Sequence, residues 1–193
     1  AMDGINFYEE FGPTAMTAKL RAEMMYNFGP CLSPTNAFHL LQGIETLPLR
    51  MQRHIENTNA LLSYLSAHDD VAWVRHPHLE THPQHELAKR LMPKGAGSII
   101  TFGVKGGRDA GRAFIEAVEL SSHLANVGDA KTLVIHPAST THSHIDPDAM
   151  KDGGLSDDMI RLSVGLEDIE DIKADFDVGF KAAKRLIAPR AAE

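Results

Sequence analysis

The sequence predicts an α+β fold, in which one small sheet is covered mainly on one face by helices. Two observations support this. Short runs rich in β-branched and aromatic side chains recur after residue 70, most of them bounded by glycine or proline. Segments with helical spacing of apolar side chains separate most of these runs, and a long helical segment precedes the first. Such alternation of short strands and helices is typical of a layered domain.

The first 65 residues divide into an irregular part and a helical part. Glycines and Gly-Pro pairs interrupt residues 1–32, so no long element is expected there. Ser33 followed by Pro34 is typical of a helix N-cap with proline at the first helical position. A glycine and then Pro48 interrupt the helical pattern that follows, so two helices are expected within residues 33–65.

The rest of the chain is expected to alternate between strands and helices. The final helix is acidic at its start and basic at its end, as the helix dipole favours. Strands are expected at residues 71–75, 97–105, 132–137 and 159–164, and helices at 84–92, 107–124 and 166–187.

Composition excludes several classes of protein. The chain has 193 residues and a net charge of −7 with no basic block, so nucleic acid is not expected as a partner. No apolar run reaches the roughly 20 residues that span a bilayer, and no signal peptide is visible, so no membrane association is expected. The lone Cys31 excludes an internal disulfide and suits a reducing compartment, so we expect a cytoplasmic protein.

Two segments are rich in histidine, a side chain that binds metals or transfers protons. Four histidines lie within residues 76–85, but their spacing matches no zinc pattern, so a solvated linker is favoured. Residues 136–146, "HPASTTHSHID", hold three more. A nucleophile–base pair of Ser139 with His142 would need an orienting group and an oxyanion hole, which the sequence does not show. A loop that binds a ligand or satisfies backbone groups is favoured over a hydrolase site, and no metal is expected.

Arg161 is a candidate binding residue because it interrupts an apolar strand, "MIRLSV". An unpaired buried charge costs several kcal/mol, so arginine in such a strand needs an anionic partner. That partner is either a structural carboxylate or a ligand, for which the planar guanidinium suits bidentate capture. The pattern alone leaves both alternatives open.

Three long motifs resemble one family of enzymes. They follow one another as "LSPTNAFHLLQGIETLPLRMQRHIENT", "NVGDAKTLVIHPASTTHSH" and "MIRLSVGLEDIEDIKADF". Together they resemble the Cys/Met-metabolism family of pyridoxal-phosphate enzymes, over a stretch from about Phe7 to Leu186. Residues 32–47 and 136–143 are most similar to the O-acetylhomoserine sulfhydrylase branch. The γ-lyases and γ-synthases usually carry arginine where this chain has Gln42.

The resemblance implies a place within a larger fold. The chain resembles the C-terminal part of a fold-type I, aspartate aminotransferase-like enzyme. Residues 1–32 would end the large domain, 33–65 would form linking helices, and 66–193 would form the small C-terminal α+β domain. In the family, a lysine in a Ser-x-Thr-Lys motif binds the cofactor, yet none of the nine lysines here stands in that motif. The chain alone is therefore expected to lack the catalytic lysine, to hold no covalent cofactor and to be inactive.

The resemblance also implies a reaction and a substrate site. Pyridoxal phosphate would serve as electron sink while the acetate of O-acetylhomoserine is replaced by sulfide or a thiol, giving homocysteine or methionine. Arg161 would bind the α-carboxylate of this amino-acid substrate, with Asn126 and Thr141 beside it. The whole enzyme is expected to be a homotetramer, a dimer of dimers. Alternatives are a cystathionine γ-synthase or methionine γ-lyase activity, or a lysine-free module without catalysis.

Overall fold

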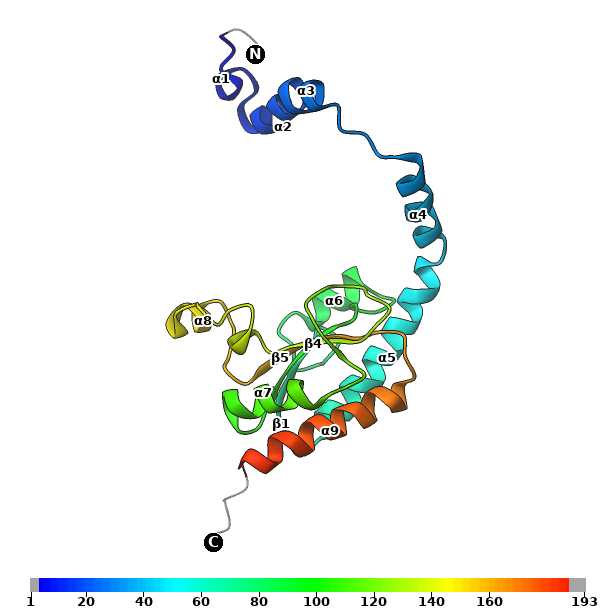
Figure 1. Cartoon of the computed structure of the whole chain (residues 1–193), viewed down its shortest axis with the longest axis vertical. Helices are drawn as coiled ribbons and strands as arrows, with labels where there is room; N and C mark the ends of the chain where they lie inside the picture. Colours follow the sequence, from blue (N-terminus) through cyan, green and yellow to red (C-terminus); the bar gives the residue numbers. More distant parts are fainter. Residues whose placement is uncertain (1–3, 188–193) are drawn as a thin grey trace. The chain divides into compact units, whose positions relative to one another are not determined.

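The computed structural model describes residues 4–187 (Figure 1). The chain divides into two compact units, Ala1–Thr46 and Leu47–Glu193, which are described separately below. Within the described residues, no helix combines the length and apolar character that crossing a membrane requires. The three-part division at residues 32 and 65 stays a prediction.

The first unit is a series of short helices, all of them without a buried residue among positions 4–46. The prediction of an irregular segment was wrong for most of residues 7–28. Alanine, methionine, lysine, arginine and glutamate, which have high helix propensity, fill this stretch between Gly12 and Gly29, and both glycines adopt positive φ at helix ends. The elements are α1 (Phe7–Phe11), η1 (Gly12–Thr14), α2 (Ala15–Lys19), η2 (Leu20–Met25), α3 (Tyr26–Phe28) and α4 (Pro34–Glu45).

The cap predicted at the start of α4 is confirmed. The Ser33 hydroxyl accepts a hydrogen bond from the backbone N–H of Asn36 at 3.1 Å, and Pro34 occupies the first helical position. The second predicted helix is α5 (Leu47–Ala67), with Pro48 in its first turn, where a missing N–H costs no hydrogen bond. Two helices therefore occupy the region as expected.

The second unit is built on a five-stranded sheet in the order β1-β2-β5-β4-β3. All neighbouring pairs are antiparallel except β3 and β4, which are parallel. Thr101 lies opposite Arg161, and Arg161 lies opposite Ile135 on the other side. The predicted α+β class is confirmed. The strands are β1 (Val71–Arg75), β2 (Ile99–Val104), β3 (Ser122–His123), β4 (Leu133–Ile135) and β5 (Met159–Ser163).

Helices cover one face of this sheet. Together with α5, the helices α7 (Gly107–Ala117) and α9 (Ile169–Ile187) enclose the core (Figure 1), while α6 (His85–Leu91) follows β1 in the chain. Phe102 of β2 packs against Phe114 and Phe176, with ring centroids 5.7 and 6.2 Å apart. Because side chains alternate along a strand, residues between the core positions point away from the helices. We call that side the open face because α5, α7 and α9 do not cover it, although Leu133, Ile135 and Met159 on it are buried by other parts of the chain.

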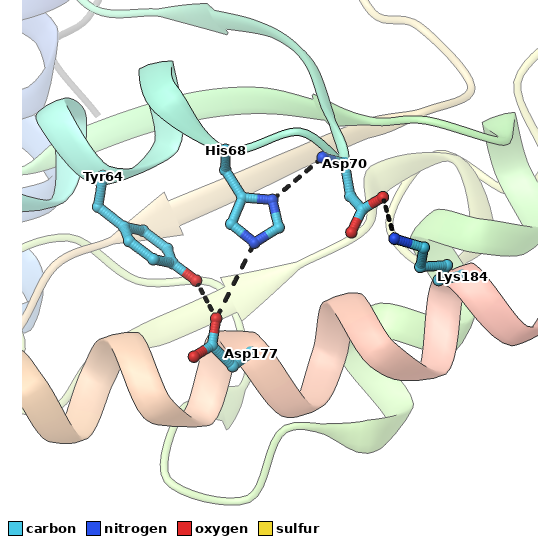
Figure 2. Close-up of polar contacts among 5 residues, drawn as sticks. All are labelled: Tyr64, His68, Asp70, Asp177 and Lys184. Carbon is cyan, nitrogen blue, oxygen red and sulfur yellow. Dashed lines mark hydrogen bonds and ion pairs between the residues drawn. The ribbon is translucent and has the colours of Figure 1, made fainter.

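A polar cluster joins the outer sides of α5 and α9 (Figure 2). The Tyr64 hydroxyl donates to the Asp177 carboxylate at 2.5 Å, and burial, followed by this hydrogen bond, raises the pKa of Tyr64. His68 Nδ1 accepts the backbone N–H of Asp70 at 3.1 Å, and the Asp70 carboxylate lies 3.7 Å from Lys184 Nζ. These contacts hold the end of α5 against α9.

Polar side chains of α5 also hold the chain just after β5. His54 Nδ1 lies 2.7 Å from the carbonyl oxygen of Val164, which can only accept, so Nδ1 carries the proton. The amide nitrogen of Asn57 donates to the carbonyl oxygens of Gly165 and Glu167 at 3.0 and 2.9 Å. The C-terminal end of β5 is therefore fixed by α5.

The helix predicted over 107–124 ends earlier, at Ala117, and this part of the prediction was wrong. The carboxylate of Asp175 on α9 accepts the backbone N–H groups of residues 119–121, which turns the chain away from the helical path. The chain then forms the short strand β3, which was not predicted. A contact with a residue distant in sequence thus overrides local propensity.

Candidate functional site

Arg161 projects from β5 onto the open face. Its neighbours Ile160 and Leu162 are fully buried against the helices, whereas Arg161 itself is half-buried. Its Nη2 donates to the backbone carbonyl oxygen of Asn126, at 3.4 Å, which orients the guanidinium group only weakly. The strand alternation therefore places a positive charge on the side of the sheet that the helices do not cover.

No structural carboxylate neutralises this charge within the described residues. The ion pairs that they form all join other side chains, and none includes Arg161. The sequence left two alternatives open. The first, a structural salt bridge, has no carboxylate to pair with Arg161 between residues 4 and 187. An anion from outside these residues fits the remaining hydrogen-bond donors of the guanidinium group.

Asn126 lies beside Arg161, in the exposed loop that joins β3 to β4. Its side-chain oxygen accepts the backbone N–H of Val127 at 2.9 Å. The side-chain nitrogen donates to no group within the described residues, so the amide is oriented with its donor available. The structure therefore brings Asn126 and Arg161 together, through the backbone of Asn126.

Thr141 is exposed on the connection between β4 and β5. Its hydroxyl lies 2.8 Å from Nδ1 of its neighbour His142. In this arrangement Thr141 contacts neither of the other two candidate residues through a hydrogen bond. The structure thus assembles two of the three predicted site residues, and leaves the third on an adjoining segment.

His136 behaves differently from the other histidines of "HPASTTHSHID". It is fully buried, and its Nδ1 and Nε2 lie 2.8 Å from the Ser139 hydroxyl and 2.7 Å from the Asp157 carbonyl oxygen. Burial lowers the pKa of His136, although the carbonyl of Asp157 acts in the opposite direction. Ser139 therefore pairs with His136 and not with His142, the base considered for a hydrolase.

The histidines of residues 76–85 are not all in a solvated linker, and that expectation was wrong for His76. It directly follows β1 and is only 2% exposed. Its Nδ1 accepts the backbone N–H of His78 at 3.1 Å, and burial lowers its pKa. Across the part of the chain that the structure describes, no three His, Cys, Asp or Glu side chains are grouped as a metal would require.

The lysines of the chain lie outside the sequence context in which the related enzymes attach pyridoxal phosphate. None of its lysines stands in the Ser-x-Thr-Lys motif. Lys89, Lys173 and Lys184 lie on helices and make ion pairs with acidic side chains, at 3.3, 2.7 and 3.7 Å. What the arrangement can do chemically is bind an anion at Arg161 and orient it.

Sequence reasoning missed the positioning roles of His54 and His136. Both side chains bond to backbone carbonyl groups far along the chain, 110 and 21 residues away. The one signal available for His136 is that it directly follows the apolar run "LVI" and so is expected to be buried. No comparable signal distinguishes His54 on its helix.

Comparison with solved structures defines the class of protein. A Campylobacter jejuni protein described as an O-acetylhomoserine (thiol)-lyase, which carries N'-pyridoxyl-lysine-5'-monophosphate, matches with a TM-score of 0.77 and 33% identity, over 88% of this chain and 40% of that one. Cystathionine γ-synthase from Xanthomonas oryzae pv. oryzae, in complex with cystathionine, matches with a TM-score of 0.75 and 36% identity, over 87% and 44%. The fold is that of fold-type I pyridoxal-phosphate enzymes.

The sequence places the chain more narrowly. Residues 12–181 match the model of the Cys/Met metabolism PLP-dependent enzyme family, and the chain belongs to that family. It is 46% identical to O-acetyl-L-homoserine sulfhydrylase 1 of Thermus thermophilus over 172 residues, which are 89% of this chain and 41% of the relative. The chain therefore spans about two fifths of that relative's length.

Proposed function

We propose that this chain is the C-terminal part of a pyridoxal-phosphate-dependent O-acetylhomoserine sulfhydrylase. The whole protein would replace the acetate of O-acetylhomoserine with sulfide or a thiol, giving homocysteine or methionine. The similarity to the Thermus thermophilus sulfhydrylase supports the reaction. The observation that carries this chain's own role is Arg161, a half-buried cation on the open face without a carboxylate partner among the described residues.

Arg161 would bind the α-carboxylate of the amino-acid substrate. A guanidinium group and a carboxylate form two parallel charge-assisted hydrogen bonds, which fix orientation as well as position. Because the carbonyl of Asn126 already accepts one Nη2 hydrogen bond, the guanidinium group would meet the substrate partly oriented. The side-chain nitrogen of Asn126 would donate to the same carboxylate, and Thr141 would border the site.

The contribution of this chain would thus be substrate orientation. Pyridoxal phosphate supplies an electron sink when it is bound, and that chemistry belongs to the cofactor. The chain would hold the substrate so that the bond to be broken is correctly aligned, which alone contributes several kcal/mol to catalysis.

The whole protein would be a homo-oligomer, in the dimer-of-dimers arrangement that the resemblance to the family implies, and exposed apolar side chains in the first unit leave a surface for the rest of the protein or a partner copy to cover. Tyr8, Met16, Tyr26 and Phe28 are 75–84% exposed, which is unusual for so many large side chains in one segment. Light scattering of the whole protein after gel filtration should give a tetramer, and a monomer at micromolar concentration would contradict the proposal. A cytoplasmic location also stays a prediction, made from the lone cysteine.

Cystathionine γ-synthase activity is the second candidate, because a solved structure of such an enzyme matches the chain nearly as well. The two differ in the nucleophile, which is sulfide or a simple thiol such as methanethiol in one case and the thiol of the amino acid cysteine in the other. The whole protein, purified with pyridoxal phosphate, should convert O-acetylhomoserine and sulfide to homocysteine much faster than it forms cystathionine from cysteine. The reverse preference would replace the first proposal with the second, and inactivity with all of these nucleophiles would refute both.

A further inference from the structure

Residues 137–158 form a long excursion between two strands that are neighbours in the sheet. It begins directly after β4 with η3 (Pro137–Ser139), carries α8 (Pro147–Asp152) and returns to β5. Figure 1 shows α8 (yellow) lying away from the sheet. Its two ends meet at His136, whose ring contacts Ser139 at one end and Asp157 at the other.

The side chain of His136 joins both ends of the excursion. The carbonyl oxygen of Asp157 can only accept a hydrogen bond, so the Nε2 that lies 2.7 Å from it carries the proton. In neutral imidazole Nδ1 is then an acceptor, and the Ser139 hydroxyl 2.8 Å away donates to it. The Thr140 hydroxyl donates to the backbone carbonyl of His136 at 2.9 Å. The segment that leaves β4 and the segment that returns to β5 are therefore joined through the imidazole ring of His136.

Helix α7 packs closely against the imidazole ring of His136. A Cβ atom at Gly111 would lie 2.8 Å from Cδ2 and Nε2 of His136, closer than side chains approach one another. Glycine inside a helix costs about 1 kcal/mol relative to alanine, and close packing against the imidazole accounts for its presence here. The guanidinium group of Arg108, also on α7, donates to the carbonyl of Ala138 at 2.8 Å. The base of the excursion is thus fixed from both sides.

These contacts rule His136 out as a proton-transfer group. The ring is fully buried, and both of its nitrogens are already engaged within the chain. Burial keeps the imidazole neutral, since it lowers the pKa below the ordinary histidine value. Its role is therefore to hold other residues in place.

We propose that His136 is a positioning residue that closes the base of the 137–158 excursion and thereby holds Thr141 in its place. The closure depends on the Nε2–H bond to Asp157, which spans the excursion, more than on the local bond to Ser139. The effect on substrate, through Thr141, rests on the proposed function. The closure itself does not.

Two substitutions separate the two bonds. In His136→Gln the side-chain nitrogen reaches the position of Nε2 and retains the bond to Asp157. In His136→Asn the shorter amide reaches only the position of Nδ1 and retains only Ser139. Gly111→Ala displaces the ring without changing it. Hydrogen exchange of the whole protein should therefore be at least about fivefold faster over residues 140–156 in His136→Asn and Gly111→Ala, but not in His136→Gln.

The exchange of β2 amides serves as the internal control for folding. If it accelerates together with residues 140–156, Ser139→Ala, which removes only the local bond, replaces His136→Asn as the comparison with His136→Gln. On this account Ser139→Ala exchanges over residues 140–156 at the wild-type rate, as His136→Gln does. Faster exchange in Ser139→Ala than in wild type would contradict the ranking of the two bonds. Wild-type exchange over residues 140–156 in His136→Asn refutes the closure.

Kinetics of the whole protein test the effect on substrate. His136→Asn should raise KM for O-acetylhomoserine about tenfold with little change in kcat, and His136→Gln should restore it. Faster exchange with an unchanged KM would show that the closure does not position the substrate. An inactive wild-type protein would refute the proposed function instead, while the exchange data still decide the closure.

Discussion

Replacing Asp175 with alanine should strongly destabilise the second unit. The carboxylate is 8% exposed and accepts three backbone N–H groups, from Glu119 at 2.7 Å, Leu120 at 3.0 Å and Ser121 at 2.9 Å. Alanine leaves all three without this acceptor. Ser121 is only 3% exposed, so its N–H is cut off from water, which costs about 1–3 kcal/mol. The other two bonds contribute about 1 kcal/mol each, for a total of about 3–5 kcal/mol.

Urea unfolding of the chain, followed by circular dichroism, measures this loss as a lower midpoint at constant slope. Asp175→Asn keeps one acceptor oxygen but turns an amide nitrogen toward an N–H, so an intermediate loss of about 1–3 kcal/mol is expected. Asp171→Ala is the matched control, because an exposed carboxylate in the first turn of the same helix contributes less than about 1 kcal/mol. A loss below about 1 kcal/mol in Asp175→Ala would refute the reasoning.

Three further predictions concern stability and cofactor binding. Tyr64→Phe removes the hydrogen bond to Asp177 and should cost about 1 kcal/mol in urea unfolding, whereas Tyr26→Phe at an 84% exposed position should cost almost nothing. Since burial lowers the pKa of His76 and His136, the unfolded chain binds protons more readily than the folded one, and Tm should fall as pH drops below about 6.5; a Tm that is constant between pH 7 and pH 5 would contradict this. Titrating the isolated chain with pyridoxal phosphate should give no saturable one-to-one absorbance band, because the attachment motif is missing, and a band that borohydride fixes on one lysine would overturn that expectation.

Local signals in the sequence predicted most elements of the second unit. Each of the four predicted strands is present. A run of β-branched residues predicts a strand, and glycine or proline at its ends indicates where the strand begins and ends. The early end of α7 could not be predicted in this way. It depends on Asp175, which is more than 50 residues further along the chain. The helices within residues 7–28 were missed because glycines were treated as breaks, whereas they lie at helix ends.

The candidate site was predictable in part. An arginine between apolar residues of a strand is recognisable in the sequence as a candidate binding residue. Arg161 lies on the open face beside Asn126. The absence of a structural carboxylate beside Arg161 among residues 4–187 could be recognised only from the three-dimensional arrangement of the strands. The role of His136 depends on a carbonyl group 21 residues away, and side-chain identity says nothing about such a partner.

Kinetics and melting of Arg161→Lys in the whole protein test the central claim most directly, that Arg161 binds the substrate carboxylate. Lysine keeps the charge but loses the bidentate geometry. The fall in kcat/KM for O-acetylhomoserine should therefore correspond to a loss of about 2–4 kcal/mol of transition-state stabilisation, while Tm stays nearly constant. Arg75→Lys is the control, because Arg75 lies on the same face, opposite Thr101, and stacks over Trp73 at 5.4 Å. It should leave kcat/KM unchanged. A destabilised Arg161→Lys protein with wild-type kcat/KM would show that Arg161 is structural and remove it from the site.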